Sequence, residues 1–187
     1  MLECRAMDMK TDCPQVSIVI KTYDDSHRAP RGVPTLKEVL VETLRQIETQ
    51  TFTPYEVLVV DSSRGDGIAQ VVQNYAPPPA FRLRHVPLPP DQFSYTRAVS
   101  VGVQRAEGEI VVSLSGDATP ANERWLEALV APLENPKVAG AFSRHVPRPG
   151  VPIAWAERLR LWWRYRSKAT SLRQTDHVFS NASSAFR

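Results

Sequence analysis

The stretch Glu-Val-Leu-Val-Val-Asp-Ser-Ser at residues 56–63 is an apolar run that stops at an acid and two hydroxyls. Its centre is too apolar for a strand that has one face in water. The run therefore predicts a strand buried on both faces, which is typical of a parallel sheet covered by helices. Further strands are predicted at 16–20, 81–86, 109–114 and 138–142.

Segments with helical patterns lie between these strands. The first begins at Thr35, because Thr35 and Glu38 form a capping-box pattern followed by apolar residues at helical spacing. Further helices are predicted at 66–75, 95–106 and 122–133. The alternation predicts an α/β fold with a mostly parallel central sheet and helices on both faces. We expect a flexible N-terminal extension over 1–15 and one domain over 16–187.

Composition narrows the class of protein. The chain has 187 residues, 42% hydrophobic content and a net charge of +3, which is ordinary for a globular domain and does not favour nucleic acid. Two cysteines exclude a disulfide framework, and no apolar run approaches the length of a membrane-spanning helix. The patterns of a P-loop, a dinucleotide-binding turn and a hydrolase nucleophile elbow are absent. A cytoplasmic location is expected.

Carboxylates and hydroxyls follow several predicted strands, at 21–25, 61–63 and 115–117. In an open parallel sheet, ligands bind beyond the carboxyl ends of the strands, so these residues are expected to share a site. Mg²⁺ and Mn²⁺ prefer oxygen ligands, and a cation that also binds a diphosphate needs little protein acid, so Asp117 alone would suffice. The alternative is that Asp61 and Asp117 only cap the helices that follow them.

Several segments in register resemble glycosyltransferase family 2, and most closely its rhamnosyltransferase-like branch. The resemblance covers about residues 16–187. Its main segments are 16–24, 56–63, 93–98 and 112–120, and the likeness continues through 138–144 and 179–187.

The resemblance implies an A-type glycosyltransferase fold, inverting chemistry and a nucleoside-diphosphate sugar donor, such as a UDP- or dTDP-sugar. Asp61 would accept a hydrogen bond from the ring N–H of the pyrimidine, and Arg97 would lie near the diphosphate. The implied nucleotide-binding residues are Thr22, Tyr23, Asp24, Asp61, Ser63 and Arg97.

The family's Asp-x-Asp metal motif is matched in part. Asp117 stands in the place of its last acid, whereas Ser115 replaces the first, and Lys21 replaces the usual proline after the first strand. Asp117 would hold Mg²⁺ or Mn²⁺ and approach the sugar. His145 follows the fifth predicted strand, near the expected sugar pocket, and Asn181 matches a family segment near the sugar or the acceptor. The other histidines, His85 among them, are interpreted as structural or solvated.

The family's acceptor-activating carboxylate would lie beyond Arg187, so the domain is expected to be incomplete at its C-terminal end and no catalytic base is assigned within it. The leading hypothesis is an enzyme of cell-surface polysaccharide or glycolipid synthesis. The alternative hypothesis is a non-catalytic fragment that binds a nucleotide sugar but lacks the base.

Residues 153–168 are basic and aromatic. On a helix they would form either a packing face, which is the favoured interpretation, or a peripheral contact with the inner face of a membrane. The membrane contact would suit a lipid-linked acceptor. Nucleic-acid binding is not expected, because no motif accompanies these residues.

Overall fold

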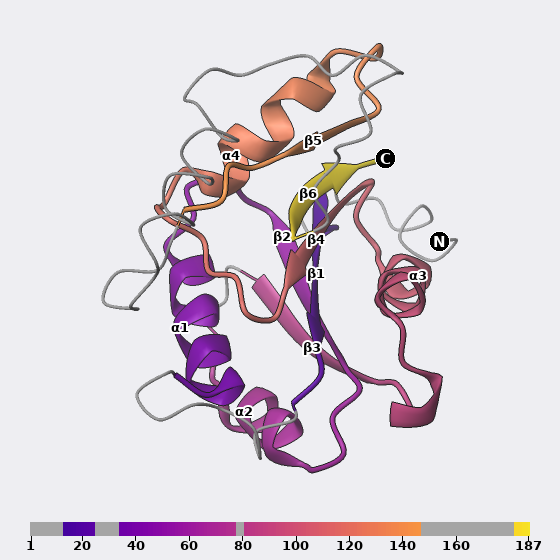
Figure 1. Ribbon diagram of the computed structural model, residues 1–187. Coiled ribbons are helices and arrows are strands. Elements are labelled where there is room, and N and C mark those ends of the chain that lie inside the picture. Colours follow the sequence, from indigo (N-terminus) through magenta and orange to yellow (C-terminus); the bar gives the residue numbers. More distant parts are fainter. Residues whose placement is uncertain (1–12, 25–33, 78–80, 147–181) are drawn as a thin grey trace, which may run out of the picture.

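The computed structural model describes residues 13–24, 34–77, 81–146 and 182–187 (Figure 1). Within these residues the chain forms one six-stranded sheet in the order β3-β2-β1-β4-β6-β5. The strands are β1 (Val16–Thr22), β2 (Tyr55–Asp61), β3 (Phe81–Pro87), β4 (Ile110–Ser115), β5 (Gly140–Phe142) and β6 (Ser183–Phe186). The helices are α1 (Leu36–Glu48), α2 (Gly67–Asn74), α3 (Tyr95–Arg105) and α4 (Trp125–Val130), with 3₁₀ turns η2 (Pro90–Gln92) and η3 (Ala131–Glu134).

The sheet is parallel from β3 through β4 and antiparallel at its far end. β1 lies between β2 and β4, and its carboxyl end is in register with theirs, since Thr22 is opposite Asp61 and Lys21 is opposite Ser115. β6 pairs antiparallel with both β4 and β5. The predicted fold class, a mostly parallel sheet with helices around it, is therefore confirmed.

The helices divide between the two faces of the sheet (Figure 1). On one face α1, α2 and α4 pack on inward-facing residues such as Ile18, Val57 and Val112, which are fully buried. On the other face α3 packs through Ala98 on a smaller cluster that includes Val19 and Leu58. Because the strands are covered on both sides, their central residues are almost uniformly apolar.

The predicted capping box at the start of α1 is confirmed. The Thr35 hydroxyl accepts the Glu38 backbone N–H at 3.3 Å, and the Glu38 carboxylate accepts the Thr35 backbone N–H at 2.7 Å. Each residue thus satisfies a backbone donor that the first turn of a helix leaves free.

The elements after β4 differ most from the predicted ones. The helix expected over 122–133 is α-helical only from Trp125 to Val130 and continues as η3, where Pro132 lacks the N–H of an α-helical bond. The strand expected over 138–142 begins at Gly140. β6 was not predicted, because Ser-Ser-Ala-Phe is too short and too polar to be told from a loop.

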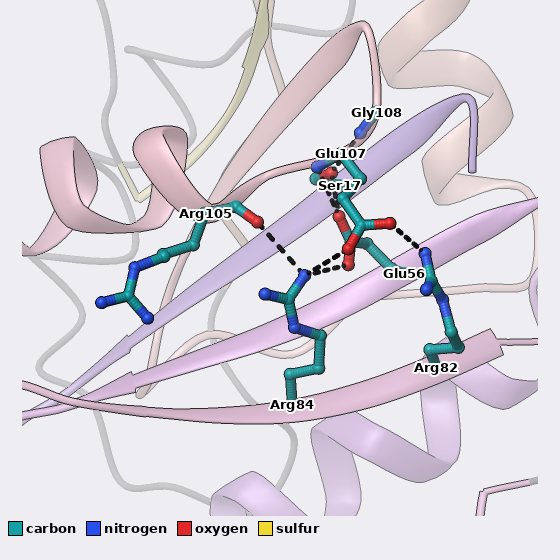
Figure 2. Close-up of polar contacts among 7 residues, drawn as sticks. All are labelled: Ser17, Glu56, Arg82, Arg84, Arg105, Glu107 and Gly108. Atoms are coloured by element: carbon teal, nitrogen blue, oxygen red, sulfur yellow. Dashed lines mark hydrogen bonds and ion pairs between the residues drawn. The ribbon is translucent and has the colours of Figure 1, made fainter. Parts of the chain in front are cut away.

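A buried carboxylate holds the sheet together at the edge opposite the carboxyl ends (Figure 2). Glu56 in β2 is fully buried and accepts hydrogen bonds from the Ser17 hydroxyl at 2.7 Å, the Glu107 backbone N–H at 2.7 Å and Arg84 at 3.0 Å. Glu107 in turn bonds Arg84 and Arg82. This network joins β1, β2 and β3 to the loop before β4, and its members satisfy one another.

Two predicted features fall outside the described residues: the basic, aromatic segment at 153–168 and most of the 1–15 extension. At the end of that extension, the Gln15 backbone N–H donates to the Pro54 carbonyl, and the Gln15 carbonyl accepts the Ile110 N–H. No helix in the described part of the chain is both long enough and apolar enough to cross a membrane.

Candidate functional site

The carboxyl ends of β1, β2 and β4 meet at one edge of the sheet (Figure 1). Backbone bonds continue past the strands, from Ser62 N–H to Thr22 O at 3.0 Å and from Gly116 N–H to Lys21 O at 2.8 Å. Asp61 ends β2 and Asp117 follows β4, one on each side of β1. Two strand spacings separate their chains, or about 10 Å. That is a span which a nucleoside diphosphate bridges.

Asp61 is buried and its carboxylate is held from three directions. Oδ1 accepts the Ser63 backbone N–H at 2.9 Å and the Thr22 hydroxyl at 3.2 Å, while Oδ2 lies 3.1 Å from His85 Nε2. Asp24 joins this group through its backbone N–H, which donates to the Ser63 hydroxyl at 2.8 Å. The loops after β1 and β2 are thus fixed to each other around one carboxylate.

Aromatic rings border this group. Tyr23 stacks on Phe93 with ring centroids 4.7 Å apart, and Phe93 meets Tyr95 edge-on at 5.4 Å. Tyr95 is 71% exposed. The stack joins the end of β1 to the segment that enters α3, and Phe93 also packs on the cluster of Val19 and Leu58 that α3 covers.

Lys21 lies under the edge, on the face that α3 covers. Its ammonium donates to the Ser113 hydroxyl at 2.6 Å. Burial lowers the pKa of Lys21 from 10.5 to about 8, and the charge of Asp117 opposes that shift. At neutral pH, below that pKa, the ammonium still places a positive charge beneath the end of β4, at the edge where open parallel sheets bind ligands.

Asp117 is exposed in the turn after β4, and its Oδ1 accepts the Ser115 hydroxyl at 2.6 Å. Among the described residues there is no cluster of three or more His, Cys, Asp or Glu side chains able to hold a metal ion. One exposed carboxylate beside a hydroxyl suits a cation whose other ligands are diphosphate oxygens and water molecules. It is too few ligands for a site in which the protein alone surrounds the cation.

The helix-capping interpretation of the two aspartates is wrong. The residue preceding α2 is Asp66 and the residue preceding α4 is Arg124, and neither Asp61 nor Asp117 bonds the first turn of the following helix. Neither carboxylate is therefore at this edge to cap a helix.

The other three predicted site residues are Arg97, His145 and Asn181. Arg97 is exposed in the first turn of α3, and its guanidinium donates to Gln92 at 2.8 Å; no described contact joins it to another predicted site residue. His145 is half-buried just past β5, whose end lies at the same edge as that of β4. Asn181 lies outside the described residues.

Two site residues were not predicted as such. His85 was interpreted as structural or solvated, yet it contacts Asp61. Lys21 stood in the 21–25 segment expected at this edge, but it was given no role of its own. A signal for His85 was present in the sequence, because it is a polar residue near the end of a predicted strand. If that strand is adjacent to β2, such a residue lies close to the last residue of β2. Strand order, which supplies that neighbour, was not available from the sequence.

Solved structures with the same architecture define the class of fold. A mannosyltransferase, PcManGT from Pyrobaculum calidifontis in complex with GDP-Man and Mn²⁺, has a TM-score of 0.63 and 22% identity over 97% of this chain and 48% of its own. S. aureus TarS 1–349 in complex with UDP-GlcNAc has a TM-score of 0.56 and 21% identity over 75% of this chain and 37% of its own. The fold is that of the A-type nucleotide-sugar transferases.

The sequence pattern of "Glycosyl transferase family 2" matches residues 17–187, and the chain belongs to that family. The glycosyltransferase AglE of Haloferax volcanii is 26% identical over 121 residues, which are 64% of this chain and 35% of AglE. The chain spans only about a third of that relative, and less than half of the two solved structures.

Proposed function

We propose that the chain binds the nucleoside-diphosphate sugar donor of an inverting glycosyltransferase. One observation carries the proposal: Asp61 and Asp117 leave the sheet at the same edge, on the two strands that flank β1. Membership in glycosyl transferase family 2 supports transfer of a sugar, and the domain is proposed to run from residue 16 to 187 after an extension over 1–15.

The nucleoside is proposed to lie over the ends of β1 and β2. Asp61 would accept a ring N–H of the base, Thr22 and Ser63 would hold that carboxylate, and Tyr23 and Asp24 would line the pocket. UDP- and dTDP-sugars suit this arrangement, since uracil and thymine both carry a ring N–H. A GDP-sugar is a further candidate, because guanine also carries one.

The diphosphate is proposed to lie between that pocket and Asp117. Asp117 would hold Mg²⁺ or Mn²⁺, which when bound offsets negative charge on the departing nucleoside diphosphate. Lys21 adds a fixed positive charge beneath the same position. Arg97 would reach the phosphates after releasing Gln92, and His145 and Asn181 are proposed to approach the sugar or the acceptor.

In the proposed reaction the acceptor hydroxyl oxygen forms a bond to the anomeric carbon as the bond from that carbon to the phosphate oxygen breaks. The nucleoside diphosphate leaves with the electron pair, and a general base takes the hydroxyl proton. Such a base contributes roughly 10²–10⁴-fold in rate. The family resemblance implies a carboxylate in this role, and none of the site residues named above is assigned to it.

Three further features belong to the proposal. The family resemblance favours the rhamnosyltransferase-like branch, with an acceptor that is a cell-surface glycan or a lipid-linked glycan. A cytoplasmic position at the inner face of a membrane, with residues 153–168 as the contact, would suit the lipid-linked acceptor. These features rest on the sequence.

A thermal-shift titration tests donor binding. UDP, dTDP and GDP are each added with and without Mn²⁺ to the parent chain and to Asp117→Ala. A bound ligand at a hundredfold excess over its Kd stabilises the fold by about 2.7 kcal/mol. We expect at least one nucleotide to raise the Tm of the parent, and Asp117→Ala to lose the Mn²⁺-dependent part. No shift with any nucleotide would refute the proposal, and a parental response from Asp117→Ala would remove Asp117 as the metal ligand.

A further inference from the structure

The Asp61 carboxylate has almost no spare hydrogen-bonding capacity. A carboxylate offers about four acceptor directions, two on each oxygen. Oδ1 uses both of its directions, for the Ser63 backbone N–H and for the Thr22 hydroxyl, whose single hydrogen is shared with the Val60 carbonyl at 3.3 Å. Oδ2 uses one, for His85 Nε2 at 3.1 Å. One direction on Oδ2 is left for a ligand, and it can only accept.

His85 reaches Asp61 from the neighbouring strand. In the register of β2 with β3, His85 lies opposite Val59 and Asp61 lies opposite Pro87, so the contact runs diagonally toward the carboxyl edge. Side chains at positions 59 and 61 share one face of β2, and His85 is on that same face. The imidazole is 23% exposed and the carboxylate 6%, so the contact is partly shielded from water.

The proton on this contact can be placed. An ionised carboxylate accepts only, so the His85 Nε2 must carry the hydrogen. That N–H fixes the rotation of the carboxylate about its last bond, because Ser63 and Thr22 hold only Oδ1. Without His85, Oδ2 would be free to take a water molecule as a donor or to turn away from the pocket.

We propose that His85 is a positioning residue that makes Asp61 selective for bases with a ring N–H. The inference rests on the proposed function, since it takes the nucleoside to lie against Asp61. Uracil, thymine and guanine present a ring N–H to the remaining Oδ2 direction. Cytosine presents an unprotonated ring nitrogen at the corresponding atom, and two acceptors would then face each other.

Such a site rejects the wrong base by leaving polar groups unpaired. A carboxylate locked in place by three donors cannot rotate to avoid cytosine, whereas a carboxylate held by two can. His85 is therefore expected to affect the ratio of the Kd values for CDP and UDP more than it affects UDP binding itself. That ratio separates positioning from simple support of the fold, which would weaken both nucleotides alike.

The test is calorimetric titration of the 187-residue chain with UDP and with CDP, at a fixed Mn²⁺ concentration. The variants are His85→Leu, His85→Phe, which keeps a planar ring, and His85→Gln, whose amide NH₂ can replace the Nε2 donor. Arg84→Gln is the matched control, because Arg84 is adjacent in β3 but serves Glu56 on the opposite face. Melting curves confirm that each variant is folded.

We expect the parent and Arg84→Gln to favour UDP over CDP alike. His85→Leu and His85→Phe should reduce that preference about tenfold, the effect of one hydrogen bond to a charged group, and His85→Gln should restore it to within about threefold. An unchanged preference in whichever of the Leu and Phe variants folds would overturn the proposal. A parent that binds UDP and CDP equally well would also overturn it. So would a His85→Gln variant whose preference for UDP is as small as that of His85→Leu and His85→Phe. A parent that binds neither UDP nor CDP here, and neither dTDP nor GDP in the thermal-shift titration, would refute the proposed function itself, which is a distinct result.

Discussion

The hydroxyl of Ser115 donates to the carboxylate of Asp117 over 2.6 Å, in the turn that follows β4. Ser115 occupies the position of the first acid in the family's Asp-x-Asp motif. Replacing it by aspartate would supply a second charged oxygen beside Asp117. We expect Ser115→Asp to tighten Mn²⁺ binding in the presence of nucleotide by about tenfold, because affinity for hard cations rises with the charge of the ligand set. Mn²⁺ titration of the nucleotide-saturated chain measures this.

Ser115→Ala is the matched control for that change. It removes the hydroxyl without adding charge, so Mn²⁺ affinity should stay within about threefold of the parent, since the cation gains no carboxylate. Ser115→Asp should also lower the Tm without Mn²⁺, because two carboxylates then repel each other. If Mn²⁺ binds equally well to the Asp and Ala variants, Asp117 does not belong to the metal site.

The buried ammonium of Lys21 predicts a stability that rises at alkaline pH. Its pKa is lowered to about 8 by burial, against 10.5 for the exposed group, with the Asp117 carboxylate opposing the shift. Below pH 8 both the folded and the unfolded chain hold the proton, and the folded chain bears the cost of burying it. Between pH 8 and 10.5 the unfolded chain binds more protons, so the free energy of unfolding increases with pH.

Lys21→Met removes this titration and isolates its contribution. The unfolding free energy of the parent, minus that of Lys21→Met, should increase by on the order of 3 kcal/mol between pH 7 and 10.5. Urea unfolding with a chelator present measures both chains, and titrating groups common to the two cancel in the difference. Curves that stay parallel across this range would show that the Lys21 ammonium is hydrated in the folded state.

Gly102 in α3 lies directly on Val19 of β1. A Cβ at position 102 would be 2.2 Å from Val19 Cγ1, closer than packed atoms approach. Gly102→Ala should therefore destabilise the fold by about 1–3 kcal/mol, since α3 must move away from the sheet. Urea unfolding provides the free energies, and Gln104→Ala, an exposed site on the same helix, should change them by no more than about 0.5 kcal/mol.

A second substitution tests the cause. Val19→Ala removes the methyl groups that the new Cβ would meet, so the double variant should lose less stability than the sum of the single losses, by about 1 kcal/mol or more. Strict additivity would mean that Gly102 is required for another reason than its contact with Val19.

Much of the fold followed from local patterns in the sequence. The apolar runs at 16–20 and 56–60 were long enough to identify strands buried on both faces, and the Thr35–Glu38 pair located the start of α1 to the residue. β6 did not follow from such a pattern. Its residues form a strand because β4 and β5 bond it from both sides, and that stabilisation is tertiary.

The site was predictable where it depends on strand ends and not where it depends on neighbours. Asp61 could be placed because an acid follows an apolar run, whichever strand lies beside it. Its contact with His85 requires that β3 is adjacent to β2 in one particular register, which only the structure supplies. The burial of the Lys21 ammonium was missed for a related reason. A lysine at a strand end is expected to be exposed unless a helix covers that face, and the position of α3 is known only from the structure.

The position of β6 in the sequence delays completion of the sheet during synthesis of the chain. A chain emerging from the ribosome can complete the parallel strands long before residues 183–186 are made, yet β4 has no partner on its outer side within the described sheet until they arrive. Translation at roughly 5–20 residues per second leaves that side exposed for seconds. During this interval an unpaired strand is a template for pairing with another chain. Premature termination before Ser183 would thus yield a nascent protein prone to aggregation.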